Sequence, residues 1–106
     1  MKGTEKQIKW AEEIIEEARG TININIDKIQ KELARVGHVS TLEDNLEIWE
    51  KMQVAYEKLI SGIDDAAIII GKKDELNGHG MVVEFDRLSR ILQEKQFAEA
   101  VSKIKK

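Results

Sequence analysis

The chain has 106 residues, a formal net charge of −3, no proline and no cysteine. The length suits a single helical domain over residues 1–106, and the lack of cysteine excludes disulfides, thiolate catalysis and cysteine-bound zinc. Hydrophobic residues make up 42% and charged residues 35% of the chain, which is typical of a folded helical protein and not of a disordered one.

The location of the protein and its charge distribution follow from the same composition. The first residues lack the apolar core of a signal peptide, and no apolar run approaches membrane-spanning length, so we expect a cytoplasmic protein. Residues 41–65 are mainly acidic, and basic residues predominate from Arg87 onward. The simplest interpretation is a solvated surface on which neighbouring helices attract each other.

The clearest signal is an apolar stripe that begins at Ile8 and continues for about eight helical turns. Thr4 and Gln7 have the spacing of a capping box, which predicts the start of a helix, and Gly37 is a natural stop. The stripe recurs at steps of three or four residues and consists of Ile8, Ala11, Ile15, Ala18, Ile22, Ile26, Ile29, Leu33 and Val36.

This first helix is too long for a compact domain. A helix of about 32 residues spans roughly 48 Å, whereas a compact chain of this size has a radius of gyration near 13 Å. Either the helix bends or breaks at Gly20, or the molecule is elongated and a second copy covers it. We favour the elongated molecule, and therefore predict a homo-oligomer.

A second helix is predicted from a capping box at Ser40 and Glu43 to about Ile60, with Trp49 in the core. Its inward stripe is Leu42, Leu46, Trp49, Met52 or Gln53, Tyr56 and Ile60, with Leu59 beside it. The two helices predict an all-α fold, a helical hairpin or bundle with one long N-terminal helix.

The rest of the chain is predicted to be shorter elements followed by a final helix. Residues 63–71 suit a short buried helix, because a lone strand has no partner for its backbone. Residues 74–80 (DELNGHG) are predicted to be a loop. Two apolar series then follow with a slip of register between them, which predicts one kinked helix or two abutting ones: Met81, Phe85, Leu88 and Leu92, then Phe97, Val101 and Ile104.

No set of residues has the spacing of a catalytic or metal site. His38 and His79 each lie beside glycine, and neither has a second histidine one helical turn away, as a metal site would need. We therefore interpret both as loop histidines without function. The pair Asp64 and Asp65 suits the first turn of a helix, where the dipole favours acids. We therefore predict a protein that is not an enzyme and that needs no metal or cofactor.

Trp10 is the best candidate for a binding residue. It lies off the main stripe, so it either widens the buried face or is an exposed anchor of the type that dominates interfaces. Glu13 and Glu17 share its side of the helix and belong to an acidic face that is either simply solvated or a docking face for a basic partner. Partner binding is therefore assigned to Trp10, Glu13 and Glu17.

The alternative function is an oligomer that binds a small anion. In that interpretation the loop at residues 74–80 and the residues His79, Arg87 and Arg90 line a pocket between protomers for a nucleotide-like ligand. Lys103, Lys105 and Lys106 form a weak basic patch without interleaved aromatic residues, so binding to nucleic acid is not expected.

The segment Thr4–Ile14 (TEKQIKWAEEI) is similar to small uncharacterised proteins of bacteria and their phages, which begin with a T/S-E-K-Q-I-x-W-A-E helix. The later stretch IDDAAIII resembles the same group more loosely. The resemblance implies a host-interaction or mobile-element setting and supplies no catalytic residues. The predicted function is a non-catalytic interaction protein, phage- or mobile-element-encoded, that binds and inhibits a host macromolecule.

Overall fold

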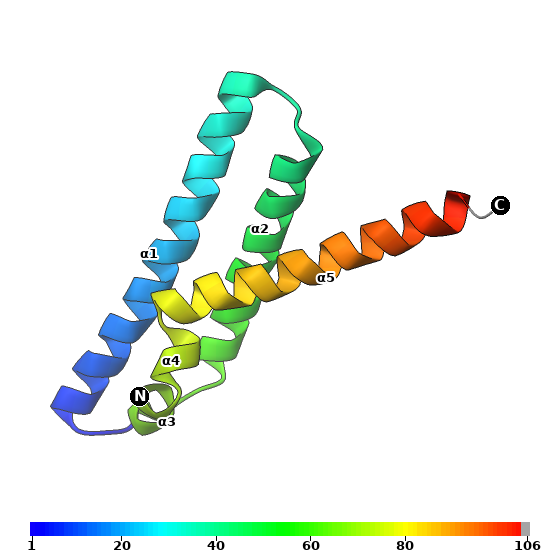
Figure 1. The fold of residues 1–106 in the computed structure, drawn as a ribbon. Helices are drawn as coiled ribbons and strands as arrows, with labels where there is room; N and C mark the ends of the chain where they lie inside the picture. The colour runs from blue at the N-terminus through cyan, green and yellow to red at the C-terminus, as the bar shows by residue number, and fades with distance from the viewer. Residues whose placement is uncertain (105–106) are drawn as a thin grey trace.

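The fold consists of helices, as predicted. In a computed structural model, residues 1–104 are described and form five helices (Figure 1). Within those residues the only extended pairing is an isolated bridge between Lys2 and Asp65. The helices are α1 (Glu5–Val36), α2 (Ser40–Ser61), α3 (Ala66–Gly71), α4 (Lys73–Leu76) and α5 (Gly78–Ile104).

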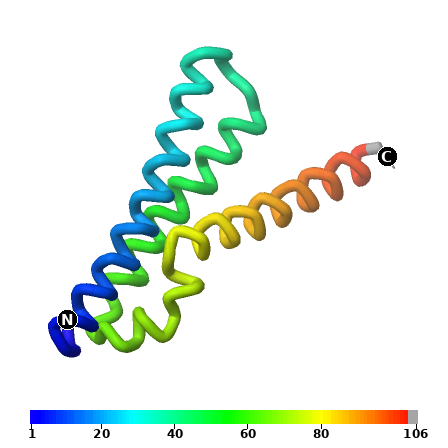
Figure 2. Tube along the Cα trace, turned by 60° about the vertical axis from the view of Figure 1, so that its left-hand side comes forward, coloured from blue at the N-terminus to red at the C-terminus, as the bar shows by residue number. Residues whose placement is uncertain are grey.

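The arrangement is a long hairpin with a third long helix across it. α1 and α2 run antiparallel, and α3 and α4 lie at the end of the hairpin near the N-terminus (Figures 1 and 2). α5 starts against this base, crosses the hairpin and extends away from it. The radius of gyration is 17.2 Å and the extents are 61 × 33 × 18 Å, well above the radius of about 13 Å for a compact chain. The predicted elongated shape is confirmed.

The predicted start and end of α1 are confirmed by its capping contacts. The backbone N–H of Gln7 donates to the Thr4 hydroxyl at 3.2 Å, and the Gln7 side-chain oxygen accepts from the Thr4 N–H at 3.0 Å. Gly37 ends the helix with φ +82°, a backbone conformation that glycine adopts without steric cost. α1 continues unbroken through Gly20, because the apolar stripe stays aligned on both sides of that residue.

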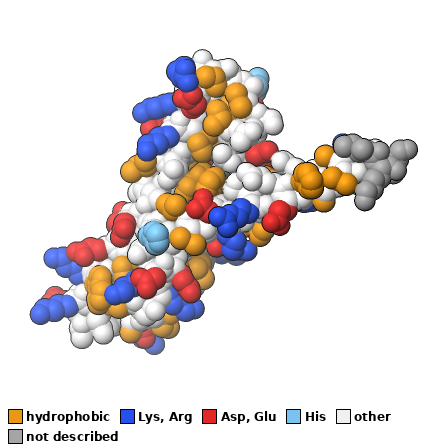
Figure 3. All heavy atoms as spheres, viewed as in Figure 1, with side chains coloured by type: hydrophobic (Ala, Val, Ile, Leu, Met, Phe, Trp, Pro, Cys, Tyr) orange, Lys and Arg blue, Asp and Glu red, His pale blue; other side chains and the backbone are white. Residues whose placement is uncertain are grey.

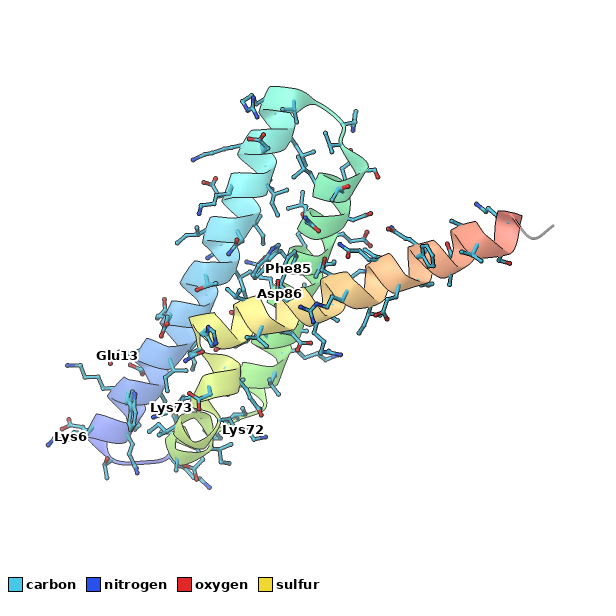
Figure 4. The ribbon with its side chains drawn as sticks, in the orientation of Figure 1. Lys6, Glu13, Lys72, Lys73, Phe85 and Asp86 are labelled. Atoms are coloured by element: carbon cyan, nitrogen blue, oxygen red, sulfur yellow. The ribbon has the colours of Figure 1, made fainter. Side chains whose placement is uncertain are left out.

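The core lies near the base of the hairpin, where α1 and α2 are covered by the other helices. Trp49 is 3% exposed and stacks on Phe85 of α5, with ring centroids 4.7 Å apart. Figure 4 shows Phe85 lying over the hairpin. The predicted core position of Trp49 is therefore confirmed. The buried residues are Ala11, Ile14, Ile15, Ala18, Ile22, Trp49, Met52, Tyr56, Ile60, Ala66, Ile69, Leu76 and Met81.

One charged contact joins the two arms of the hairpin. The Arg19 guanidinium on α1 donates two hydrogen bonds to the Glu57 carboxylate on α2, at 2.7 and 2.9 Å, and a third to Glu16 at 2.8 Å. Both carboxylates raise the pKa of Arg19, so the cation is fixed. Because all three side chains are partly exposed, the network sets the register of the hairpin more than it adds stability.

The predicted capping box of α2 is wrong. Val39 is the residue that precedes the first helical turn, and no side chain caps it. The Glu43 carboxylate instead contacts Nδ1 of His38 at 2.5 Å. That contact raises the pKa of His38, which is itself almost fully exposed. The imidazole therefore competes for the carboxylate that a capping box would need.

α3 forms as predicted. Asp65 accepts a hydrogen bond from the N–H of Ala67 at 2.9 Å, and Ile69 is completely buried. The Asp64 carboxylate lies 3.5 Å from the N-terminal ammonium group. The N–H of Lys2 donates to the backbone oxygen of Asp64, and the carbonyl of Lys2 accepts from the N–H of Ala66. Both aspartates therefore have structural partners.

The predicted loop at residues 74–80 is wrong, because helices α4 and α5 divide that segment and only Asn77 lies between them. The Asn77 side chain accepts from the N–H of Gly80 at 2.8 Å and caps the first turn of α5. A Cβ at Gly80 would lie 2.3 Å from the backbone oxygen of Glu75, and one at Gly78 would lie 2.5 Å from the Thr21 hydroxyl. The two glycines allow α5 to start in close contact with α1 and α4, and do not mark a flexible loop.

The final segment is one continuous helix, α5, and both apolar series belong to it. No helix within residues 1–104 is long and apolar enough to cross a membrane.

Substitution of two helical glycines should have opposite effects on stability. Gly80→Ala places a methyl group against backbone atoms that cannot move aside, so we expect the free energy of unfolding to fall by about 2 kcal/mol. Gly20→Ala meets nothing within 4 Å and should raise it by about 0.5–1 kcal/mol, because alanine favours the helix. Urea denaturation followed by circular dichroism measures both. Equal effects of the two substitutions would contradict the tight start of α5.

Candidate functional site

An apolar groove is bounded by α2, α4 and the first turns of α5, and is here called the α2–α5 groove. Its volume is about 810 Å³, within the range typical of binding sites in proteins. Leu59 on α2 and Val83 on α5 are each about half exposed there. The lining residues are Lys51, Met52, Ala55, Tyr56, Leu59, Asp74, Glu75, Leu76, His79, Gly80, Met81, Val83, Glu84 and Leu88.

The groove exists because α5 leaves the hairpin at an angle. Met52, Tyr56 and Leu59 recur on one side of α2 at helical spacing, and Leu88 faces them from α5. The two helices touch where Phe85 stacks on Trp49 and diverge on either side of that contact. Apolar side chains that would be buried between parallel helices are therefore left in an open cleft.

Tyr56 connects the floor of the groove to its α4 wall. Its hydroxyl donates to the backbone oxygen of Leu76 at 2.8 Å, and the side chain is only 4% exposed. Burial raises the pKa of Tyr56 to about 12. The hydrogen bond satisfies a carbonyl at the end of α4, which is too short to be stable without such contacts.

The edge of the groove is acidic. Asp74 and Glu75 form no salt bridge with any residue in the range 1–104. Glu84 accepts from Arg87 at 3.1 Å, and this donation holds the pKa of Glu84 below its usual value, so the carboxylate stays ionised. Lys51, the one cation in the lining, pairs with Glu47 at 2.9 Å.

The structure brings the three predicted partner-binding residues to one surface beside α4. Trp10 is 44% exposed, and the ammonium group of Lys73 lies 5.1 Å from the centre of its ring, a cation–π distance. Glu13 and Glu17 lie on the same side of α1, and both are exposed. Figure 4 shows Glu13 on α1 and Lys73 on the neighbouring α4. We call Trp10, Glu13 and Glu17 the Trp10 surface.

The residues predicted for the alternative anion site are only partly brought together. His79 lines the α2–α5 groove and is exposed, whereas Arg87 and Arg90 are not among its lining residues. Arg87 is engaged with Glu84 instead. Lys103 is exposed at the end of α5, and Lys105 and Lys106 lie outside the described residues.

His38 lies far along the chain from these features, in the turn between α1 and α2, and borders a small hollow of about 170 Å³ with Leu33, Gly37 and Glu43. Within residues 1–104, no three histidine or acidic side chains are close enough together to hold a metal ion.

The sequence predicts one wall of the α2–α5 groove and not the other. The alternative anion site places a pocket at residues 74–80, and Asp74, Glu75, Leu76, His79 and Gly80 line the groove, but the facing wall comes from α2 and not from Arg87 and Arg90. A usable signal was present, because Val83 interrupts the inward series of the last helix with an apolar residue on a different face.

Comparison of the chain with protein-family models, with curated proteins and with solved structures gives no match. Functional inference therefore depends on the groove and on the Trp10 surface.

Because burial raises the pKa of Tyr56, the stability of the protein should fall at high pH. Tyr56→Phe should lower the free energy of unfolding by about 1 kcal/mol at neutral pH, because the Leu76 carbonyl loses its partner. Between pH 10 and 12 the native tyrosine keeps its proton and the unfolded one loses it, so wild-type stability should fall by up to about 2 kcal/mol from this group alone. The phenylalanine variant should show a shallower fall over the same range. Parallel slopes in urea denaturation would show that Tyr56 is not the titrating group.

Proposed function

We propose that the protein is a non-catalytic, cytoplasmic interaction protein that binds another macromolecule through the α2–α5 groove. The observation that carries the proposal is the open apolar lining of the groove. Leu59 and Val83 are exposed there, in the same lining as buried core residues such as Met52. An exposed apolar hollow of this size is typical of a surface that meets a partner.

The chemistry of the groove favours an amphipathic helix as the bound segment. A helix presents large apolar side chains three and four residues apart, and the floor of the groove offers matching positions along α2. Asp74 and Glu75, which line the groove, favour lysine or arginine next to that apolar face. The proposed partner is therefore a protein with a basic amphipathic helix.

The Trp10 surface supports a wider contact. α4 provides one wall of the groove with Leu76 and, through Lys73, also covers part of the Trp10 ring. A partner that binds in the groove and extends across α4 therefore meets an exposed tryptophan and the carboxylates of Glu13 and Glu17. Inhibition of a host protein, in a phage or mobile-element setting, is the form of this function that the resemblance of Thr4–Ile14 favours.

Sequestration of a small ligand is the second candidate, because the volume of the groove also suits a small molecule. The carboxylates of Asp74, Glu75 and Glu84 repel an anion, so an apolar or cationic ligand fits the lining better than a nucleotide does. Native mass spectrometry separates the two candidates, since a retained small-molecule mass supports sequestration.

Substitution in the groove should abolish capture of the partner. Tagged wild-type protein and the variants Leu59→Gln and Val54→Gln are compared for the proteins that they retain from a bacterial lysate. Val54 is the matched control, because it is 70% exposed on the same helix and lies about 140° around α2 from Leu59. A partner retained by wild type and by Val54→Gln, and lost with Leu59→Gln, is the expected result. Equal retention by all three would contradict the groove as the binding site.

Trp10→Ala tests the wider contact separately. The side chain is nearly half exposed, so its removal should lower the free energy of unfolding by at most about 1 kcal/mol, mainly through the lost contact with Lys73. Affinity for the captured partner should fall by about 10-fold or more if the tryptophan is an anchor. A large loss of stability with unchanged affinity would make Trp10 a structural residue.

A further inference from the structure

α5 has two apolar faces that point in opposite directions. Its inward series, with Phe85 and Leu88, packs on the core. Phe97 lies two and a half turns beyond Leu88, a net rotation of about 180° around the helix. Phe97 is accordingly 72% exposed, the highest value among the large hydrophobic residues whose burial the structure describes. Phe97 therefore lies on the side of α5 opposite to Leu88 and faces away from the hairpin of its own chain.

The face of α5 that carries Phe97 includes exposed Arg90 before it and partly exposed Val101 after it. Arg90 precedes it by one heptad and Val101 follows it by one turn, so the three residues share one side of the helix. We call Arg90, Phe97 and Val101 the outer stripe of α5. This half of the helix extends beyond the hairpin in both views of the chain, over a length of roughly 20 Å (Figures 1 and 2). On a different side from the outer stripe it keeps one contact with its own hairpin, where the Gln96 side-chain amide donates to the Asp44 carboxylate of α2 at 3.1 Å.

The far end of the hairpin is also left uncovered. Val36 and Val39 are 44% and 37% exposed, and Leu33 and Leu42 are only partly buried. We call these four residues the hairpin end. Figure 3 shows hydrophobic side chains along the seam between α1 and α2 in this region and again on the projecting part of α5. Two helices alone cannot bury such a seam, because each side chain keeps one side in water.

The α2 side of the hairpin end is acidic, and the projecting part of α5 has a small excess of basic residues. On the α1 side, Lys31 and Arg35 are paired with Asp27 and Glu32. The stretch of α2 over residues 40–50 carries Glu43, Asp44, Glu47 and Glu50 and no cation. The projecting part of α5 carries Arg90, Lys95 and Lys103 against Glu94 and Glu99, and Arg90 pairs with no carboxylate within the described residues. An approach of the outer stripe of α5 to the hairpin end is therefore favoured electrostatically.

We propose that two copies of the chain form a two-fold dimer in which the outer stripe of each α5 packs on the hairpin end of the other copy. The contact is reciprocal, so each copy both donates a helix and receives one. Two such contacts, each about 20 Å long and one helix wide, cover a footprint of about 900 Å² before the relief of the side chains is counted, near the lower limit for a specific interface. This pairing is independent of the α2–α5 groove, which stays open in the dimer.

The dimer is tested with purified full-length protein by analytical ultracentrifugation. Wild type should be a dimer, and Phe97→Glu should raise its dissociation constant by about 100-fold or more, because a charge replaces the central apolar contact. Val39→Glu should do the same from the receiving surface. A carboxylate beside the first turn of α2 suits the helix dipole, so loss of the dimer in this variant is not a consequence of unfolding. Val54→Glu and Leu59→Gln, both outside the proposed interface, should remain dimers.

A mixture of Phe97→Glu and Val39→Glu makes the test specific for the reciprocal contact. The mixed pair keeps one intact contact, between the α5 of the Val39→Glu chain and the hairpin end of the Phe97→Glu chain, so heterodimers should form where neither variant dimerises alone. A monomeric wild type at every accessible concentration would overturn the proposal. A Phe97→Glu monomer together with a Val39→Glu dimer would also overturn it, since that result indicates contact between the two α5 helices instead.

Discussion

Because α1 spans about 48 Å and the helices that cover the hairpin are short or leave it at an angle, the chain cannot bury the whole of its longest apolar stripe. This mismatch of lengths governs the structure. Burial is complete from Ala11 to Ile22, where α3, α4 and the first turns of α5 meet the hairpin, and it becomes partial towards Val36. The chain therefore has a dense core at its base and two exposed projections, the hairpin end and the second half of α5.

The base is held together by close contacts between short elements. α4 has only a single turn and is fixed by the Tyr56 hydroxyl, by the packing of Leu76 and by Lys73 over Trp10. Asn77 then reverses the chain and caps α5, and glycine at position 80 lets the first turn approach the backbone of Glu75. This packing fixes the direction in which α5 leaves the hairpin. The α2–α5 groove and the projection of the outer stripe are both consequences of that direction.

The proposed partner site and the proposed dimer contact lie in different places for the same physical reason. Each is an apolar surface that α5 fails to cover, one where it diverges from the lower part of α2 and one where it passes the hairpin end. Their charges differ, since Asp74 and Glu75 border the groove, whereas Arg90 lies on the outer stripe. Two different occupants, a basic helix and a second copy of the chain, therefore suit the two surfaces.

The sequence by itself determined the helices whose signals are local. The stripe from Ile8 to Val36, the Thr4 capping box and the stop at Gly37 predicted α1 to within a residue, because periodicity and capping depend on neighbours in the chain. Only the tertiary structure decided that the glycines at positions 78 and 80 belong to the first turn of a helix and not to a loop. The reason is their close contact with Thr21 and Glu75, which the local sequence does not show. It also decided the groove, because a cleft depends on the angle between helices, and that angle is set by side chains distant in sequence, as in the stacking of Phe85 on Trp49.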